Sequence, residues 1–476
     1  LTRPILARPI LKPDSGTQQH DEAVPDGMLM PDLMVRAFRE IATESPSIRI
    51  VNLSVCDPHA PFDTIPSGWA RALDWLTAEH GMLSVVSAGN HTALELAVDQ
   101  VTFAAANDGD RRRWTLEALS MHALSRRLLT PAESINSLTV GALHSDAAGA
   151  YVSGQRVDLL EDALIPSPVS GIGRGFRRSV KPDVHAPGGR QLFTVDLGGH
   201  ATTTRLLPAI GSLPPGLRAA CPTSVDPTTG EVHIRGTSGS TALITRRAAR
   251  LLELVDALRS GVAGFEDRHI AAALKALVVH GAEWPDTKLV NVDDGLPVDR
   301  LLTYGWLATD HVLGCPPNRV TVLTVGDLGA REEEDVIIPL PASLSGVVGK
   351  RRITATLAWL SPINWRHRQY RRAKLGFGKP GGALNPVIDS KQIGLRRAQR
   401  GTVQHQIFEG SGAVPIGVDD DIRLTVQCTE QAGGLNGTSV PYAVAVSLEV
   451  AEALGVDVYT EVAARIRPPV RVVARP

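Results

Sequence analysis

A serine at the start of a predicted helix is the residue of this chain best placed to do chemistry. Residues 236–242 are rich in glycine and hydroxyl side chains, and they lead into residues 243–255, where apolar residues recur at helical spacing. Ser238 is therefore expected at a helix N-terminus, beside free backbone N–H groups and the positive end of the helix dipole. Those donors could meet the oxyanion that forms when a serine attacks an acyl carbon. Serine is also an ordinary helix cap, so this stretch alone leaves catalysis and capping open.

A second stretch ends in an asparagine that could supply a further donor. Residues 83–90 form a short apolar run that finishes in small residues and Asn90, the pattern of a buried strand with the asparagine at its carboxyl end. In open α/β sheets, functional sites lie at that end of the strands. Asn90 is therefore a candidate partner for Ser238.

The pairing of a strand-end asparagine with a downstream Gly-Thr-Ser helix start resembles subtilisin-like serine proteases, the subtilase family. The resemblance matches Ser238 with the nucleophile of that family and Asn90 with its oxyanion-hole asparagine. Further pieces follow in the family's order between about residues 48 and 308: a strand at 50–55, a strand at 137–142, Lys-Pro-Asp at 181–183, Ala-Pro-Gly at 186–188, and Tyr-Gly-Trp-Leu at 304–307. Each piece is weak alone, but their order makes the resemblance strong.

The resemblance also implies two edges of a substrate cleft. One edge would consist of Ser54, Val55 and Cys56. The other would consist of Ser87, Ala88 and Gly89. The family commonly has glycine where this chain has Cys56, and a side chain at that position could narrow the cleft.

A serine hydroxyl needs a base, and the base of the family is not recognisable in this sequence. Subtilisin-like enzymes use an aspartate in Asp-Ser/Thr-Gly and a histidine in His-Gly-Thr, in the chain order Asp, His, Ser. The sequence contains no His-Gly-Thr. Asp14-Ser15-Gly16 fits the aspartate motif, and His20 follows six residues after Asp14. Six residues are too few for the crossover between two elements of a parallel layer, so we interpret this pair as a polar loop.

Two explanations remain for the missing base. The chain is either a fragment whose Asp and His lie upstream of Leu1, or a degenerate, non-hydrolytic relative. We favour the fragment, because the sequence begins without Met and keeps both Asn90 and Ser238. The complete protein is then expected to be a serine endopeptidase working through an acyl-enzyme on Ser238, and these 476 residues alone are expected to be nearly inactive. The alternative is a catalytically dead pseudo-protease that binds peptides or proteins.

The pattern of elements predicts two domains. Strands at 48–54 and 83–88 alternate with helices at 32–42 and 69–80, which predicts a parallel sheet flanked by helices over residues 1–314. A further helix is expected at 270–281 and a solvated loop at 108–113. A long irregular segment, which could contain a β-hairpin just before the serine helix, is expected at 188–227. After Cys315, short alternating runs separated by turns predict a C-terminal β-sandwich or jelly roll over residues 315–476.

Composition limits the classes of partner. The formal net charge is −1, so no global field favours nucleic acid, a membrane surface or an acidic partner. The sharpest basic run, residues 365–374, is interpreted as an exposed loop or edge strand with arginines paired to acidic neighbours, rather than as a nucleic-acid site. No stretch of about 18 apolar residues occurs, so no membrane span is expected. A peptide or protein substrate is the expected partner, and the oligomeric state is not indicated.

Neither metals nor cofactors are indicated. The four isolated cysteines exclude a disulfide scaffold and a zinc site of the usual spacing, and the glycines at 171–175 lack the dinucleotide-binding pattern. Asp419, Asp420 and Asp421 could bind calcium, which is common among subtilases, but a solvated acidic turn is the favoured interpretation. The unpaired cysteines and the lack of a visible signal peptide mildly favour a cytoplasmic location.

Overall fold

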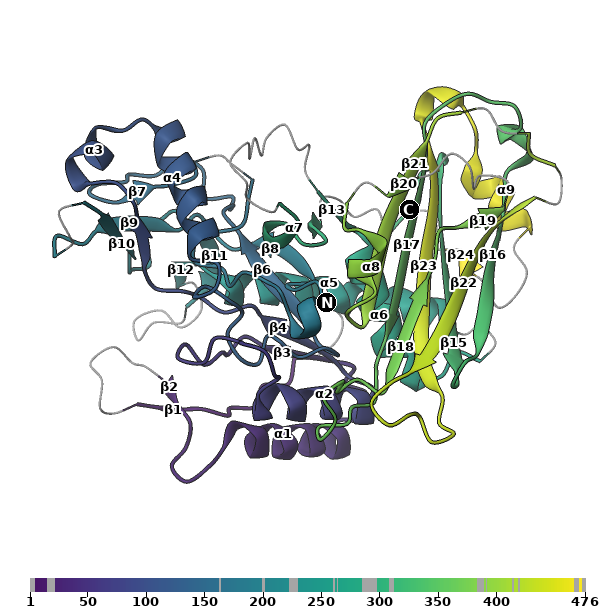
Figure 1. Cartoon of the computed structure of the whole chain (residues 1–476), viewed down its shortest axis with the longest axis horizontal. Coiled ribbons are helices and arrows are strands. Elements are labelled where there is room, and N and C mark those ends of the chain that lie inside the picture. The colour runs from purple at the N-terminus through teal and green to yellow at the C-terminus, as the bar shows by residue number, and fades with distance from the viewer. Residues whose placement is uncertain are drawn as a thin grey trace.

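The computed structural model of this chain consists of an α/β lobe and, beside it, a lobe of long antiparallel strands (Figure 1). The residues that it describes are 5–14, 22–161, 164–198, 202–221, 230–259, 262, 264–284, 298–307, 312–382, 389–390, 392–412, 415–417, 420–465 and 471–472.

A six-stranded sheet forms the centre of the α/β lobe, in the order β13-β14-β8-β6-β4-β3. Its members are β3 (Ile50–Leu53), β4 (Leu83–Ser87), β6 (Leu138–Leu143), β8 (Val184–Pro187), β13 (Ala282–Glu283) and β14 (Trp306–Leu307). The strands from β3 to β14 are parallel, and β13 is antiparallel to β14. Strands β4 and β6 are buried throughout, as expected for parallel strands covered on both faces. The predicted parallel sheet is confirmed.

Helices cover both faces of this sheet. On one face, α1 (Met30–Glu44) and α2 (Gly68–His80) share a core with Val86 of β4. On the other face, α5 (Thr237–Arg259) and α6 (Asp267–His280) share a core with Val85. Val85 and Val86 point to opposite faces because side chains alternate along a strand. The helices predicted at 32–42, 69–80 and 270–281 correspond to α1, α2 and α6.

A smaller sheet lies beside the carboxyl edge of the central sheet, in the order β5-β10-β9-β7. Its strands are β5 (Leu94–Leu96), β7 (Val157–Asp158), β9 (Leu192–Val195) and β10 (Thr204–Pro208). A hairpin of β11 (Leu217–Ala220) and β12 (Glu231–Ile234) precedes α5. The segment predicted to be irregular, 188–227, therefore holds β9, β10 and β11.

The loop predicted at 108–113 is wrong, because α4 (Asp108–Met121) begins there, after α3 (Gln100–Ala105). Asn107 caps α4 by accepting a hydrogen bond from the Asp110 N–H at 2.9 Å. Arg113 then pairs with Asp110 at 3.1 Å and with Glu117 at 3.2 Å. These one-turn charge pairs stabilise a helix whose sequence is too polar to show an apolar stripe.

The second lobe is a β-sandwich, as predicted. Its larger antiparallel sheet has the order β20-β21-β17-β23-β15-β24, and its smaller sheet has the order β16-β22-β18, with β19 also paired to β22. The strands are β15 (Arg319–Leu328), β16 (Glu333–Pro339), β17 (Arg351–Trp359), β18 (Ala373–Phe377), β19 (Gly381–Gly382), β20 (Asp389–Ser390), β21 (Val403–Gly410), β22 (Asp421–Glu430), β23 (Val440–Val450) and β24 (Arg471–Val472). A large apolar core including Trp359 and Tyr442 fills the space between the sheets.

Short elements complete the described chain. They are β1 (Lys12–Pro13), β2 (Glu22–Ala23), η1 (Phe176–Arg178), α7 (Val298–Leu301), η3 (Ala342–Leu344), α8 (Leu395–Ala398), η5 (Glu452–Leu454) and α9 (Val458–Arg465). Among the described residues, no helix is both long and apolar enough to cross a membrane.

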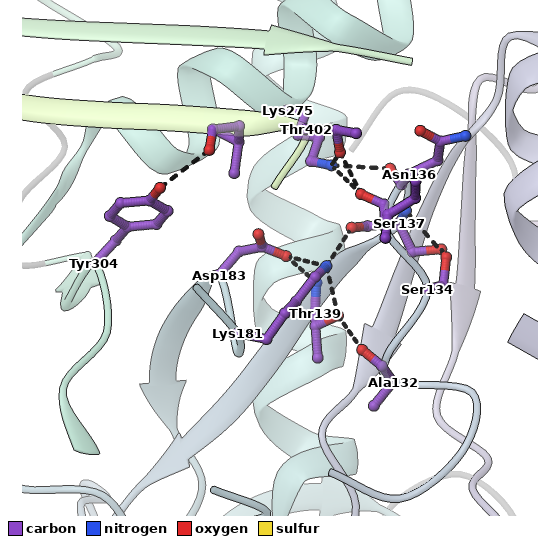
Figure 2. A network of polar contacts seen from close by, with 12 residues as sticks. Ala132, Ser134, Asn136, Ser137, Thr139, Lys181, Asp183, Lys275, Tyr304 and Thr402 are labelled. Carbon is purple, nitrogen blue, oxygen red and sulfur yellow. Dashed lines mark hydrogen bonds and ion pairs between the residues drawn. The ribbon is translucent and has the colours of Figure 1, made fainter. Parts of the chain in front are cut away.

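Helix α6 joins the two lobes. Every residue from His269 to His280 is buried, and one apolar core continues from the central sheet across α6 to β23. At its middle, the Lys275 Nζ donates hydrogen bonds to Ile135 O and Asn136 O, both at 3.1 Å, and to Thr402 Oγ1 at 2.8 Å (Figure 2). Thr402 belongs to the sandwich lobe, so this lysine ties the two lobes together.

Candidate active site

Ser238 lies in the first turn of α5, which starts at Thr237. The residue ahead of the helix, Gly236, has φ +109°, a conformation that other residues rarely adopt. A Cβ atom there would also lie 2.8 Å from both Oδ1 and Nδ2 of Asn90. Glycine is therefore required for the backbone to pass this close to Asn90 and turn into the helix.

Asn90 lies beside that helix start. It follows β4, and its Oδ1 accepts hydrogen bonds from the Thr237 N–H at 2.9 Å and from Thr237 Oγ1 at 3.0 Å. Asn90 is exposed and Ser238 is half-buried. Within the described residues, the Nδ2 group of Asn90 donates no hydrogen bond, so it is available to a ligand. The structure thus brings the two predicted site residues to the same edge of the central sheet.

The first predicted cleft edge contacts Ser238 directly. The Ser238 hydroxyl donates to Ser54 O at 3.2 Å, and the Ser54 hydroxyl is 3.4 Å from Ser238 O. Strands β3 and β4 are paired in parallel with Leu53 opposite Val86, so Ser54 and the half-buried Val55 come level with the start of the second edge. Ser54 is thus the residue of this edge that contacts the serine.

The second predicted edge is more deeply buried. Ser87 and Ala88 are buried, and Gly89 has φ +94°. A Cβ atom at Gly89 would lie 2.5 Å from the Cβ of Leu129, whose N–H donates to Ala88 O at 3.0 Å. The segment carrying Leu129 packs against this edge and fixes the direction in which the chain reaches Asn90.

The side chain of Cys56 spans the two edges. Its Sγ lies 3.3 Å from Ser87 O and 3.2 Å from Ser87 Oγ. Burial raises the pKa of this thiol to about 12, so it stays protonated at neutral pH and is not a competing nucleophile. The sulfur occupies space between the edges that a glycine would leave open, in line with the predicted narrowing.

Two residues that sequence reasoning did not single out hold the helix start in place. Thr237 connects α5 to Asn90, as described above. Ser240 Oγ lies 3.1 Å from both Ala186 O and Pro187 O, and the Gly236 N–H donates to Gly188 O at 2.8 Å. Their signal was present in the sequence, because both belong to the small-residue run that contains Ser238.

A base for Ser238 is absent from the part of the chain that the structure describes. The hydrogen-bond acceptor of the Ser238 hydroxyl is a backbone carbonyl, and no histidine or carboxylate there bonds to it. His91, next to Asn90, is turned away, with its Nε2 at 2.8 Å from Arg127 O, and burial lowers its pKa. Of the weighed pair, Asp14 is described, whereas His20 lies outside the described residues.

The described residues do not form a metal site. No group of three or more His, Cys, Asp or Glu side chains among them could hold an ion. Asp419 lies outside the described residues, Asp420 Oδ2 accepts from the Gly417 N–H at 2.7 Å, and Asp421 lies 3.7 Å from Arg423. All four cysteines are free thiols.

The family model described as "Subtilase family" matches residues 27–306. The chain belongs to the subtilase family. The predicted resemblance is thereby confirmed, and the chain is a serine-protease-type domain followed by a β-sandwich.

One curated relative matches part of this subtilase. An uncharacterized protein of Sinorhizobium fredii (strain NBRC 101917 / NGR234), y4bN, is 34% identical over 167 residues, which are 34% of this chain and 36% of that protein. The match therefore spans about a third of the length of that relative.

Solved structures similar to this subtilase include other proteases. The prenylagaramide maturation protease PagA is 17% identical, with a TM-score of 0.31 over 61% of this chain and 75% of that chain. MycP1 without its N-terminal propeptide is 17% identical, with a TM-score of 0.26 over 54% of this chain and 62% of that chain. A lanthipeptide protease is 15% identical, with a TM-score of 0.30 over 58% of this chain and 63% of that chain.

Proposed function

We propose that this subtilase carries the nucleophile of a serine endopeptidase that cleaves peptide bonds through an acyl-enzyme on Ser238. The observation that supports it most is the contact between Thr237 and Asn90, which joins the helix start bearing Ser238 to the strand-end amide. A nucleophile, a helix N-terminus and a free amide donor then share one accessible edge of the sheet. That is the arrangement that acyl transfer requires.

In the proposed mechanism, Ser238 Oγ attacks the scissile carbonyl carbon, and the carbonyl oxygen becomes an oxyanion. The Ser238 N–H and the Asn90 Nδ2 group donate hydrogen bonds to that oxyanion. A histidine oriented by an aspartate takes the serine proton and returns it to the leaving amine, and water then hydrolyses the acyl-enzyme. We expect that histidine and aspartate to come from sequence upstream of Leu1. Ser54 and Val55 on one side and Ser87, Ala88 and Gly89 on the other would line the peptide. Because the Ala88 and Gly89 carbonyls already accept hydrogen bonds from Leu129 and Gly171, the second edge would hold the peptide without these two acceptors.

A pseudo-protease is the second candidate. Two observations favour it: no base contacts Ser238 within the described residues, and Cys56 fills space between the cleft edges. Such a protein would bind a peptide in the cleft without cleaving it. The proposal of catalysis includes no metal or organic cofactor, because serine acyl transfer needs none.

Turnover of a fluorogenic peptide library distinguishes the two candidates. The protein made from its complete coding sequence should cleave, and Ser238→Ala should abolish cleavage. Asn90→Ala should lower kcat by about a hundredfold or more, because the oxyanion loses one donor. The 476-residue chain alone should show no turnover above background. Cleavage that survives Ser238→Ala would contradict the proposal, and complete inactivity with intact peptide binding would favour the pseudo-protease.

A further inference from the structure

Seven arginines lie on three segments that meet between the two lobes. Two are on the hairpin between β17 and β18, two are at α8, and three are in the segment around η1; they are Arg366, Arg368, Arg396, Arg400, Arg174, Arg177 and Arg178. In Figure 1, α8 lies on the side of the sandwich that faces the α/β lobe. We call this set the arginine surface.

Buried anchors on the hairpin bring these segments together. The ring of Tyr370 lies 5.4 Å from that of Phe176 in η1, and its hydroxyl donates to Asp74 Oδ2 at 2.6 Å. Arg371, also buried, donates from Nη1 to Arg400 O at 3.1 Å and to Gly401 O. The C-terminal end of the hairpin, next to β18, is thereby held between η1 and the residues that follow α8.

The segment around η1 and the segment after α8 are also in direct contact. A Cβ atom on Gly401 would lie 3.7 Å from the Cβ of Ser179, one residue beyond η1. The arginine surface is therefore built from both lobes and depends on their docking.

The arginine surface has no matching negative charge in the described part of the chain. None of its seven arginines forms an ion pair there. This was not the sequence-based expectation, which paired the arginines of the basic run with acidic neighbours. Arginines elsewhere do follow that rule: Arg113 pairs with Asp110 and Glu117, and Arg218 pairs with Glu231 at 2.5 Å.

Burial and neighbouring guanidinium groups both disfavour the positive charges at this place. The pKa of Arg174 is lowered by burial and then by Arg300, Arg178 and Arg400. The neighbouring Arg397 has its pKa lowered to about 10 by burial and by Arg174 and Arg400. A bound anion would relieve this repulsion, so binding of negative charge is favourable at this place.

We propose that the arginine surface binds an acidic segment of a polypeptide. Guanidinium groups form paired hydrogen bonds with carboxylates, and Arg177, Arg178, Arg396 and Arg400 are all exposed. These four arginines lie on or just after two single-turn helices, η1 with three residues and α8 with four. Helices this short do not suit the major groove of a nucleic acid.

The aromatic content of this place also favours a polypeptide over single-stranded nucleic acid. Proteins that bind single strands stack successive bases on several aromatic rings. On the hairpin that carries Arg366 and Arg368, the exposed aromatic rings are those of Trp365 and His367, while Tyr370 is buried. One indole and one imidazole can pack on a peptide but do not make a row of stacking platforms.

Fluorescence anisotropy with a labelled glutamate-rich peptide tests the proposal. The matched peptide with glutamine at each glutamate is the ligand control, and single-stranded DNA is the competing ligand. The glutamate peptide should bind at about 50 mM salt and weaken severalfold at about 200 mM, while the glutamine peptide should not bind. The triple variant Arg177→Glu, Arg178→Glu, Arg400→Glu should lose about tenfold or more in affinity.

A second variant separates the arginine surface from general basicity. Arg36→Glu with Arg39→Glu reverses two exposed arginines on α1 and should leave peptide affinity unchanged. Ser238→Ala should also leave it unchanged, because the proposal does not depend on catalysis. Equal binding of the two peptides, no binding of either, or equal losses in both arginine variants would overturn the proposal. Tighter binding of DNA that is lost in the triple variant would assign the surface to nucleic acid instead.

Discussion

Polar side chains gather at both ends of the central sheet, and the two groups are built differently. At the carboxyl edge, Ser238 is half-buried, Asn90 is exposed, and the Nδ2 group of Asn90 has no partner among the described residues. At the amino edge, Lys181 and Asp183 are buried and form an ion pair at 2.7 Å (Figure 2). Lys181 also donates to Ser137 O at 2.8 Å and to Thr139 Oγ1 at 2.9 Å.

The difference follows from the cost of burying charge. A buried ion is tolerated only when partners replace its water, so the amino-edge group is fully bonded and holds the structure together. A site that must bind a reacting group needs donors that are free until that group arrives. The amino-edge group should therefore govern stability, and the carboxyl-edge group should govern chemistry.

Breaking the amino-edge ion pair should have the largest effect on folding. Asp183→Ala leaves the Lys181 ammonium buried without its carboxylate and leaves the Thr139 N–H, 2.7 Å from Asp183 Oδ2, unpaired. We expect a loss of about 3–5 kcal/mol in unfolding free energy. Urea denaturation followed by circular dichroism measures it. Asp110→Ala on α4 removes a half-buried carboxylate from a solvated ion pair; it is the control and should cost no more than about 1 kcal/mol. An equal loss in both variants would contradict this account.

Lowering the pH should reduce the free energy of unfolding by less than the Asp183→Ala substitution does. Burial lowers the pKa of His185 to about 4 and that of His405 to about 3, and it lowers the pKa of His280 well below 6.5. Between these values and 6.5 the unfolded chain binds protons that the folded chain does not, so stability falls as pH falls.

Asp74 contributes to the pH dependence of stability in the opposite direction. Burial raises its pKa to about 6, so between about pH 4 and 6 the folded chain holds a proton that the unfolded chain has released. Three histidines outweigh this one carboxyl, and we expect a net loss of about 2–3 kcal/mol from pH 6 to pH 5. Urea titrations at the two pH values measure it. Asp74→Asn should steepen the loss with pH, and a stability that rises toward pH 5 would contradict the assignment.

Substitutions at the carboxyl edge should have smaller effects on folding. Gly236→Ala forces a Cβ atom against Asn90 at positive φ and should cost about 1–3 kcal/mol. Its matched control, Ser238→Ala, removes a half-buried hydroxyl with one carbonyl partner and should change stability by less than about 1 kcal/mol. Thermal melts of both variants test which of them loses more stability. If Ser238→Ala loses as much as Gly236→Ala, the serine has a structural role.

Features encoded locally were the ones that the sequence could predict. The Gly-Thr-Ser start of α5 and the apolar strand before Asn90 are continuous in the chain, and the order of family motifs placed them in one domain. The sandwich strands were visible from their alternation. The start of α4 was not predicted, because its glycine and its charged residues are also typical of a solvated loop.

Contacts between distant residues could not be predicted from sequence. Lys275 meets Thr402 across 127 positions, and Tyr370 meets Asp74 across 296. Lys275 is a charged residue inside the apolar run of α6, and Tyr370 stands in a strongly basic run. Their burial is decided by how α6 and the hairpin pack between the lobes, which no local pattern records.

Labelling with a peptidyl phosphonate tests the central claim most directly, because such a reagent reacts with a serine only when a base activates it. In the protein made from its complete coding sequence, mass spectrometry should find one phosphonate on Ser238. The Ser238→Ala variant should carry no label. The control variant Arg36→Glu, changed at an exposed residue of α1, should be labelled on Ser238 like the parent protein. The 476-residue chain alone should remain unlabelled. An unlabelled complete protein, folded and able to bind peptide, would contradict catalysis by Ser238.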